Sequence, residues 1–279
     1  MSTLPDVSAY VPCFNDRTTL GRTLDSLAAQ TVPVSEVVVI DDGSDDGSVD
    51  SVHGHRVRVV RHRENLGRGA ARARAMEEVA SEYVVCCDAN KALDPAFVAR
   101  ALKWFDDPTV AAVFGPIRQP LASSPAERWR GRHLFKEHVD HRVCRSASLS
   151  TAGALVRAGA VRCVGGYDAR LTHSEDADLG SRLLAAGYDV VFDPALVITA
   201  TAPNSWREVL ERYWRWHAGP AEAVTLRGYA QGIAYAVKSM MAADLRERDA
   251  LGALVSFMVP HYQFGRSLWR SRRLVHRAD

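Results

Sequence analysis

The sequence predicts an α/β fold with a mostly parallel central sheet, flanked by helices and followed by a C-terminal helical extension. Two observations predict it. Short runs of β-branched residues alternate with helical stretches through the first half of the chain. These runs are apolar at successive positions, which is typical of strands buried on both faces of a parallel sheet. A content of 47% hydrophobic and 24% charged residues in a chain of 279 is that of a globular protein and excludes a disordered one.

The first half of the chain supplies five expected strands and three expected helices, in alternation. The strands are expected at residues 7–11, 36–40, 56–60, 83–87 and 110–114. The helices between them are expected at residues 17–29, 68–80 and 95–104. Residues 118–150 are rich in Arg and lack a clear period, so they form a loop or a surface helix, and we expect a substrate-facing lid there.

After residue 150 the sequence again shows patterns typical of strands and helices. Further strands are expected at residues 151–156, 188–192 and 196–200. Ser174 stands where it would cap a helix that ends before Gly187. From Ser205 onward, apolar residues at helical spacing predict an amphipathic helix, and Ser205 with Glu208 predicts a capping box.

Charge and cysteine content limit the possible partners and the compartment. The formal net charge is +2, which provides no general field for a polyanion, and we expect no binding of nucleic acid. Five cysteines are an odd number, and the adjacent Cys86 and Cys87 lie in an apolar run typical of a core strand. We find no secretory signal and no apolar run long enough to span a bilayer, so we expect a cytoplasmic protein.

Acidic residues follow two of the expected strands. Asp41 and Asp42 come directly after a strand, and Asp88 follows another. Ligands of open α/β sheets bind at the carboxyl ends of the strands, so these residues are candidates for a binding site. The alternative is that each Asp only closes its strand with a turn.

Seven segments in a fixed order resemble family 2 glycosyltransferases, which are inverting enzymes of the A-type glycosyltransferase fold. The segments lie at residues 11–15, 37–48, 65–75, 88–90, 165–168, 174–194 and 212–216, with the sequences VPCFN, VVVIDDGSDDGS, NLGRGAARARA, DAN, GGYD, SEDADLGSRLLAAGYDVVFDP and RYWRW. The resemblance implies a catalytic domain at residues 1–218, with residues 219–279 as a helical extension that ends in a basic tail.

The resemblance also implies a site for a nucleoside diphosphate sugar. Asp42 would accept hydrogen bonds from the base or ribose, and Pro12 and Asn15 would shape the floor beneath the base. Arg72 would offer its guanidinium to the base or a phosphate, the alternative being a solvated residue on a helix. Asp88 would contact the ribose or a metal ion.

The expected metal site departs from the family pattern. Asp88 would bind Mg²⁺ or Mn²⁺ together with the residue two positions later, where the family has a second carboxylate and this chain has Asn90. An amide oxygen is a legitimate ligand without charge, and we expect weak metal use, with His217 as a further candidate ligand. As an alternative to metal, Lys91 would place an ammonium group beside the phosphates. It could equally be a solvated loop lysine.

Catalysis is implied at two further segments. Glu175 and Asp176 match an acidic pair in which the Asp deprotonates the acceptor hydroxyl, and the first turn of a helix favours its charged form. Arg212 and Arg215 match a motif that helps to hold the departing diphosphate, and their spacing puts both on one helix face. His217 would otherwise be a core or interface residue.

The sequence therefore predicts an inverting glycosyltransferase that acts on a nucleoside diphosphate sugar and an unidentified acceptor with a free hydroxyl. One alternative is a catalytically weakened relative that only binds nucleotide or a partner, which Asn90 suggests and Asp176 argues against. A nucleotidyltransferase would need a Gly-rich loop bearing Lys after the first strand, which is absent. The basic residues 265–277 either contact the inner face of an anionic membrane or form a solvated tail.

Overall fold

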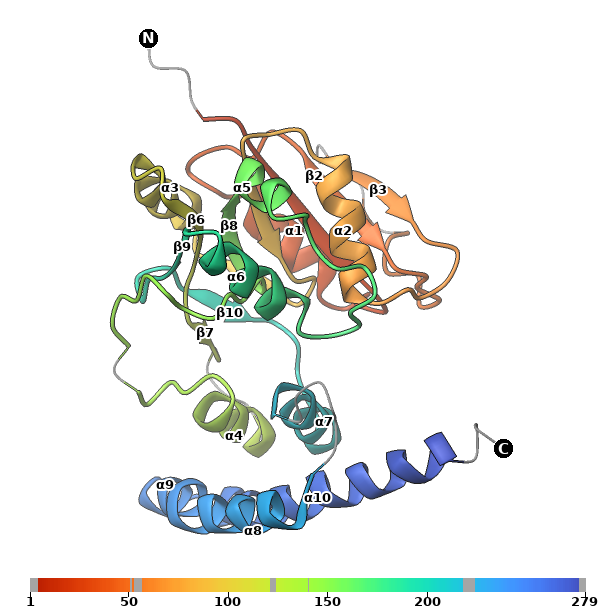
Figure 1. Ribbon diagram of the computed structural model, residues 1–279, viewed down its shortest axis with the longest axis vertical. Helices are drawn as coiled ribbons and strands as arrows, with labels where there is room; N and C mark the ends of the chain where they lie inside the picture. Colours follow the sequence, from red (N-terminus) through yellow and green to blue (C-terminus); the bar gives the residue numbers. More distant parts are fainter. Residues whose placement is uncertain are drawn as a thin grey trace. The chain divides into compact units, whose positions relative to one another are not determined.

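The computed structural model describes residues 5–50, 52, 57–120, 124–139, 141–217 and 224–275. The chain divides into two compact units. Unit 1 is Met1–Pro120 with Val139–Ala202, and unit 2 is Leu121–His138 with Pro203–Asp279 (Figure 1).

Unit 1 is built on a seven-stranded sheet in the order β3-β2-β1-β4-β8-β6-β9. Its strands are β1 (Val7–Cys13), β2 (Val37–Asp41), β3 (Val57–Arg61), β4 (Tyr83–Cys87), β6 (Val110–Phe114), β8 (Gly153–Arg157) and β9 (Asp189–Phe192). Neighbouring strands are parallel except at β8, which runs antiparallel to both β4 and β6. The mostly parallel sheet predicted from the sequence is confirmed.

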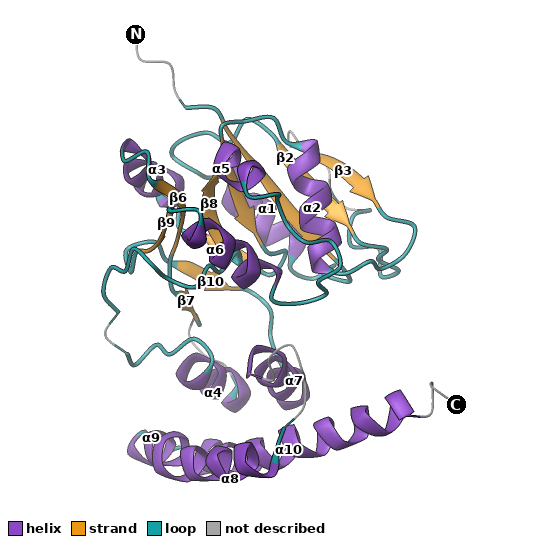
Figure 2. Cartoon of the chain, viewed as in Figure 1, coloured by secondary structure: helices purple, strands orange, loops and turns teal. Residues whose placement is uncertain are grey.

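Helices cover both faces of this sheet, which explains the unbroken apolar runs (Figure 2). They are α1 (Leu20–Ala28), α2 (Arg68–Glu78), α3 (Phe97–Leu102), the 3₁₀ turn η1 (Lys103–Asp106), α5 (Ala158–Cys163) and α6 (Glu175–Ala185). Successive residues of β1 face opposite cores: Val11 packs with α1 and α3, and Tyr10 packs with α2, α5 and α6. Cys86 and Cys87 of β4 are buried free thiols, as expected.

A second, three-stranded sheet in unit 1 consists of β5 (Lys91–Leu93), β10 (Ile198–Ala200) and β7 (Ile117–Arg118). The sequence did not predict β5 or β7. Lys91 pairs with Ala200 in antiparallel register, and the backbone N–H of Thr201 donates to the carbonyl of Asn90 at 3.0 Å. This small sheet therefore fixes the backbone directly after Asp88.

The described residues of unit 2 form helices and no strand (Figure 2). The helices are α4 (Pro125–His133), α7 (Trp206–His217), α8 (Leu226–Tyr235), the π-helix η2 (Ala236–Met241), α9 (Ala242–Arg246) and α10 (Ala250–Val275). Within the part of the chain that the structure describes, no helix combines the length and the apolar character that a bilayer crossing requires.

The compact units differ from the predicted boundary at residue 218, because α4 and α7 pack with the C-terminal helices. Trp129 of α4 lies 5.6 Å, centroid to centroid, from the ring of Tyr213 in α7, and its indole N–H donates to Ser256 of α10 at 2.8 Å. The stretch predicted as a loop or surface helix thus contains a helix, which begins with a capping box of Ser124 and Glu127. Its predicted action as a lid, and the division into a catalytic domain and an extension, stay predictions.

Candidate active site

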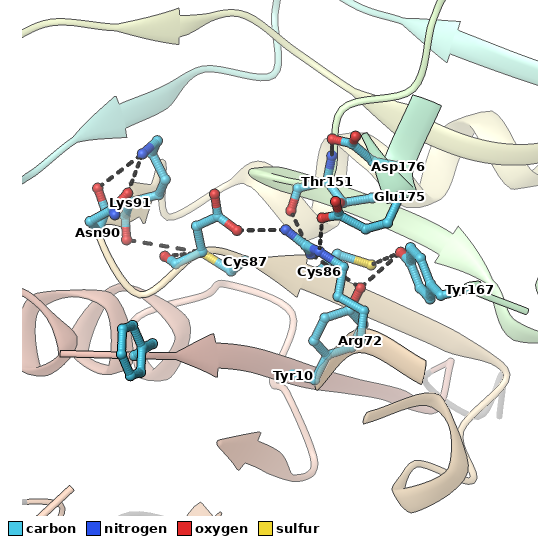
Figure 3. A network of polar contacts seen from close by, with 12 residues as sticks. Tyr10, Arg72, Cys86, Cys87, Asn90, Lys91, Thr151, Tyr167, Glu175 and Asp176 are labelled. Carbon is cyan, nitrogen blue, oxygen red and sulfur yellow. Dashed lines mark hydrogen bonds and ion pairs between the residues drawn. The ribbon is translucent and has the colours of Figure 1, made fainter. Parts of the chain in front are cut away.

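A buried ion-pair network lies among the carboxyl ends of the central strands (Figure 3). Arg72 of α2 is 1% exposed and donates through Nη2 to Asp88 at 2.6 Å and through Nε to Glu175 at 2.9 Å. Its Nη1 lies 3.4 Å from both the Tyr10 hydroxyl and the Thr151 carbonyl. Arg72 is therefore not a solvated helix residue. All three of its nitrogens already donate to the protein, and its contact with a nucleotide stays a prediction.

The network keeps Asp88 ionised. Burial alone would raise the pKa of this carboxyl, but Arg72, Arg68 and Lys91 outweigh burial and hold its pKa below the usual range. A carboxylate with this environment carries its charge at neutral pH, and it can bind a ribose hydroxyl or a cation.

Two tyrosines complete the buried side of the network. The hydroxyl groups of Tyr10 and Tyr167 are hydrogen bonded at 2.8 Å, and burial raises the pKa of both. Tyr167 lies in the matched segment GGYD, which was the one signal in the sequence for this contact, and no role was assigned to it there. Both groups are neutral hydrogen-bonding supports for Arg72.

Asp176 stands in the first turn of α6, beside Glu175. Its Oδ1 accepts from the N–H of Ala177 at 2.9 Å, and its Oδ2 lies 3.4 Å from the N–H of Thr151. Ser174 does not cap the helix as predicted, because it has φ +62° and makes no side-chain capping bond. The buried Glu175, paired with Arg72, anchors this end of the helix instead. The helix end at Gly187, with φ +85°, is as predicted.

Asp42 holds the loop that leads into α2. Its carboxylate accepts from the N–H groups of Leu66 at 3.0 Å and Gly67 at 2.8 Å, and it lies 2.7 Å from Nδ1 of His62. Gly67 has φ +94°, a conformation that a side chain disfavours. The structure thus shows Asp42 as the organiser of this loop, and its contact with a nucleotide stays a prediction.

Asn15 ties the end of β1 to the loop after β2. It adopts φ +56°, its N–H donates to Ser44 Oγ at 3.0 Å, and its Oδ1 accepts from the N–H of Asp45 at 3.1 Å. Pro12 of β1 pairs with Ile40 of β2 and directly precedes Cys13, the last residue of β1. These residues lie near the carboxyl ends of the neighbouring strands β1 and β2, where Asp42 also lies, and their contact with a nucleotide base stays a prediction.

Asn90 and Lys91 form a contact that the sequence did not reveal. The Lys91 ammonium donates to the Asn90 carbonyl at 3.3 Å and to the Asn90 side-chain oxygen (Figure 3). Lys91 is only 4% exposed, which excludes a solvated loop lysine. Asp16 lies close by: burial and Asp88 raise the pKa of Asp16, whereas Lys91 and a hydrogen bond from Asn90 lower it, with a net rise.

Both predicted metal ligands have cationic partners in the structure. Asp88 Oδ1 is bound to Arg72, and the side-chain oxygen of Asn90 accepts from Lys91. Across the described ranges, no group of three or more His, Cys, Asp and Glu side chains is placed to hold a metal ion. His217, the other candidate, ends α7, and its side chain is outside the described residues.

Arg212 and Arg215 belong to α7, in unit 2, whereas the groups above belong to unit 1. The Ser205 and Glu208 capping box at the start of α7 is as predicted, with Ser205 N–H donating to Glu208 at 2.7 Å. The side chain of Arg215 is outside the described residues. The contact of both arginines with a departing diphosphate stays a prediction.

Solved structures define the class of protein to which this fold belongs. A mannosyltransferase, PcManGT from Pyrobaculum calidifontis, in complex with GDP-Man and Mn²⁺, superposes with a TM-score of 0.64 at 21% identity, covering 96% of this chain and 88% of that one. S. aureus TarS 1–349 in complex with UDP-GlcNAc superposes with a TM-score of 0.60 at 14% identity, covering 94% and 89%. The fold is that of the A-type glycosyltransferases.

The sequence pattern of glycosyl transferase family 2 matches residues 8–165, so the chain belongs to that family. Among curated relatives, the poly-β-1,6-N-acetyl-D-glucosamine synthase of Staphylococcus epidermidis is 26% identical over 239 residues, which cover 80% of this chain and 56% of the synthase. The pre-mycofactocin glycosyltransferase of Mycobacterium tuberculosis is 27% identical over 231 residues, covering 80% and 48%. The chain thus spans about half the length of the curated relatives it matches.

Proposed function

We propose that this chain transfers a sugar from a nucleoside diphosphate donor to an acceptor hydroxyl, with inversion at the anomeric carbon. The observation that carries the proposal is the position of Asp176. Its carboxylate lies at a helix N-terminus, next to Glu175, and the ion pairs of Arg72 link Glu175 to Asp88 at the end of β4. Family membership supports the reaction class.

Asp176 acts as the general base in this proposal. It takes the proton of the acceptor hydroxyl as that oxygen attacks the anomeric carbon, and the bond to the diphosphate breaks in the same step. Its carboxylate is partly exposed, whereas Glu175 is 2% exposed and committed to Arg72. Of the acidic pair, only Asp176 is accessible to an acceptor.

The donor site in this proposal is the edge of unit 1 where Asn15, Asp42 and Asp88 lie at strand ends. The loops there are held by hydrogen bonds between Asn15 and residues 44 and 45, and by the N–H groups of residues 66 and 67, which donate to Asp42. The solved relatives hold UDP-GlcNAc and GDP-Man, so uridine and guanosine diphosphate sugars are the first donors to test. Arg212 and Arg215 would stabilise the departing diphosphate.

The fold relatives also imply a divalent cation, because the mannosyltransferase was solved with Mn²⁺. The residues present here do not fit one. An ammonium group holds the Asn90 oxygen and a guanidinium holds Oδ1 of Asp88, so a metal ion would have to displace the ammonium group and bind next to the guanidinium. We assign no step of the reaction to a metal ion.

The proposal is tested by a thermal-shift screen of UDP and GDP sugars, since ligand at 100 times its dissociation constant stabilises by about 2.7 kcal/mol. With the donor found, Asp176→Asn should keep donor affinity and lose roughly two to four orders of magnitude in turnover. Asp178→Asn is the matched control, because Asp178 shares the first turn but pairs with Arg182. Wild-type turnover by Asp176→Asn, or no donor binding at all, would refute the proposal.

We also propose that unit 2 contacts an anionic membrane surface through its C-terminal helix and that the protein works in the cytoplasm. Exposed apolar residues of α10 support the contact, because Leu251, Leu254, Met258 and Leu268 recur at helical spacing and are each more than 40% exposed. Residues 276–279 of the basic tail are outside the described residues.

A further inference from the structure

Lys91 is a buried cation shortly after the end of β4, beside the expected metal ligands Asp88 and Asn90. It is the first residue of β5, three positions after Asp88, and only 4% exposed. Burial of a charged amine without partners is costly, so its neighbours must favour the charged form. Its neighbours include the oxygens of Asn90 and two carboxylates, Asp16 and Asp88.

The backbone that carries Lys91 is fixed from three sides. The Lys91 carbonyl accepts from the hydroxyl of the buried Thr23 in α1 at 2.7 Å. Its strand pairs with β10 through Ala200, and Thr201 N–H holds the carbonyl of Asn90 at 3.0 Å. The ammonium group is therefore positioned by rigid elements and carried on a flexible stem, which lets it exchange the Asn90 oxygens for those of a ligand.

The local charges argue against a divalent ion at this place. The Lys91 ammonium group donates to both oxygens of Asn90, so its positive charge lies on a group that a metal ion would use. Asp88 is also paired with Arg72. A metal ion bound between these groups would repel two fixed cations at short range, and that repulsion is strong where water is excluded.

A polar atom without a partner lies next to the same loop. The hydroxyl of Thr201 is buried and makes no hydrogen bond to the described residues, although Thr201 N–H binds Asn90. Buried hydroxyl groups are normally paired, so an unpaired one indicates a ligand or water. A phosphate oxygen is an acceptor that would satisfy such a hydroxyl.

We propose that Lys91 replaces the divalent cation in this glycosyltransferase, its ammonium group binding the diphosphate of the donor so that the enzyme needs no metal ion. This inference rests on the proposed function. In the transfer, the acceptor oxygen bonds to the anomeric carbon, and the diphosphate oxygen leaves with the electron pair of the broken bond. The acceptor proton goes to Asp176, and Lys91 stays protonated throughout while it meets the new charge on the diphosphate.

The first experiment measures binding of UDP and GDP, and of uridine and guanosine, by calorimetry in EDTA and in Mn²⁺. For whichever nucleotide binds, we expect the wild type to show the same affinity for the diphosphate in both buffers. Lys91→Gln should weaken diphosphate binding about tenfold or more, because it loses a charged hydrogen bond, and leave nucleoside binding unchanged. Lys103→Gln, which removes an exposed lysine of η1, is the matched control.

A reciprocal variant tests the same idea by gain of function. Asn90→Asp combined with Lys91→Ala restores the carboxylate and removes the ammonium group, so diphosphate binding should become about tenfold or more tighter in Mn²⁺ than in EDTA. Retained nucleoside binding shows that each variant is folded.

Three outcomes would overturn the inference. If the wild type binds the diphosphate only in Mn²⁺ and not in EDTA, the inference is overturned and the proposed function stays intact. This comparison needs no variant. Unchanged diphosphate affinity in Lys91→Gln would do the same. Failure of the wild type to bind either diphosphate in either buffer would overturn the proposed function itself, and the inference with it.

Discussion

Arg72→Met should destabilise unit 1 strongly and in a pH-dependent way. Methionine keeps the length of the apolar stem but leaves Asp88 and the 2% exposed Glu175 without their cation. Breaking a buried ion pair by removing one partner costs about 3–5 kcal/mol. For a chain of this size that corresponds to a fall in melting temperature of roughly 6–20 °C.

The sign of the pH dependence follows from Asp88. In the wild type its pKa is lowered in the folded state, so it adds stability above its unfolded value of 3.8 and loses it as pH falls. Without Arg72, the largest lowering influence, burial is opposed only by Arg68 and Lys91, and we expect the folded pKa of Asp88 to lie above that value. The folded variant then binds more protons than the unfolded chain, so its stability falls as pH rises from about 4.

The assay is thermal unfolding followed by circular dichroism at pH 5 and pH 7.5, with the wild type alongside. Arg74→Met is the matched control, because Arg74 lies on the same helix but its side chain is 46% exposed and its ion pairs are at the surface. The reasoning would be refuted if Arg72→Met lowered the melting temperature as little as the control does, or lowered it equally at both pH values.

Three further predictions follow from other contacts. Asp42→Ala should raise the dissociation constant of the donor nucleotide about tenfold, measured by calorimetry, and an unchanged constant would leave Asp42 as a loop anchor only. Gly67→Ala should lower stability by roughly 1–2 kcal/mol in denaturant titration, because φ +94° disfavours a side chain, and a neutral result would contradict that account. Leu254→Gln should reduce flotation with phosphatidylglycerol vesicles but leave the unfolding midpoint unchanged, and flotation equal to that with phosphatidylcholine would exclude the membrane contact.

The sequence was most informative where a local pattern alone decides the structure. The strands β4 and β6 begin and end at the residues expected, because each is a compact apolar run bounded by polar residues. The short strands β5 and β7 were missed, since two or three residues carry no period and form strands only through β10. The helix α4 was left between two alternatives, because its buried face is completed by Tyr213 and Ser256 far along the chain.

In the candidate site, too, the sequence predicted what a local motif decides and missed what depends on distant residues. The motifs named Asp42, Asp88 and Asp176, and the structure places all three at strand ends or a helix start of unit 1. The partners of those residues were not predictable. Arg72 was expected to contact a ligand, which stays a prediction, but its ion pairs to Asp88 and Glu175 were not foreseen, because a pairing across 103 residues leaves no trace in local sequence.

Helix α4 belongs to unit 2, although the segments before and after it in the chain belong to unit 1. This order affects how the protein folds during synthesis. The chain leaves unit 1 after residue 120, returns after 138 and leaves again after 202. A ribosome therefore completes the strands of unit 1 while α4 has emerged but α7 and α10 have not. Until they arrive, Trp129 has neither Tyr213 nor Ser256 to pack against. The central sheet can form early, whereas α4 must wait for α10, and nascent chains stalled before α10 should expose this tryptophan to chaperones.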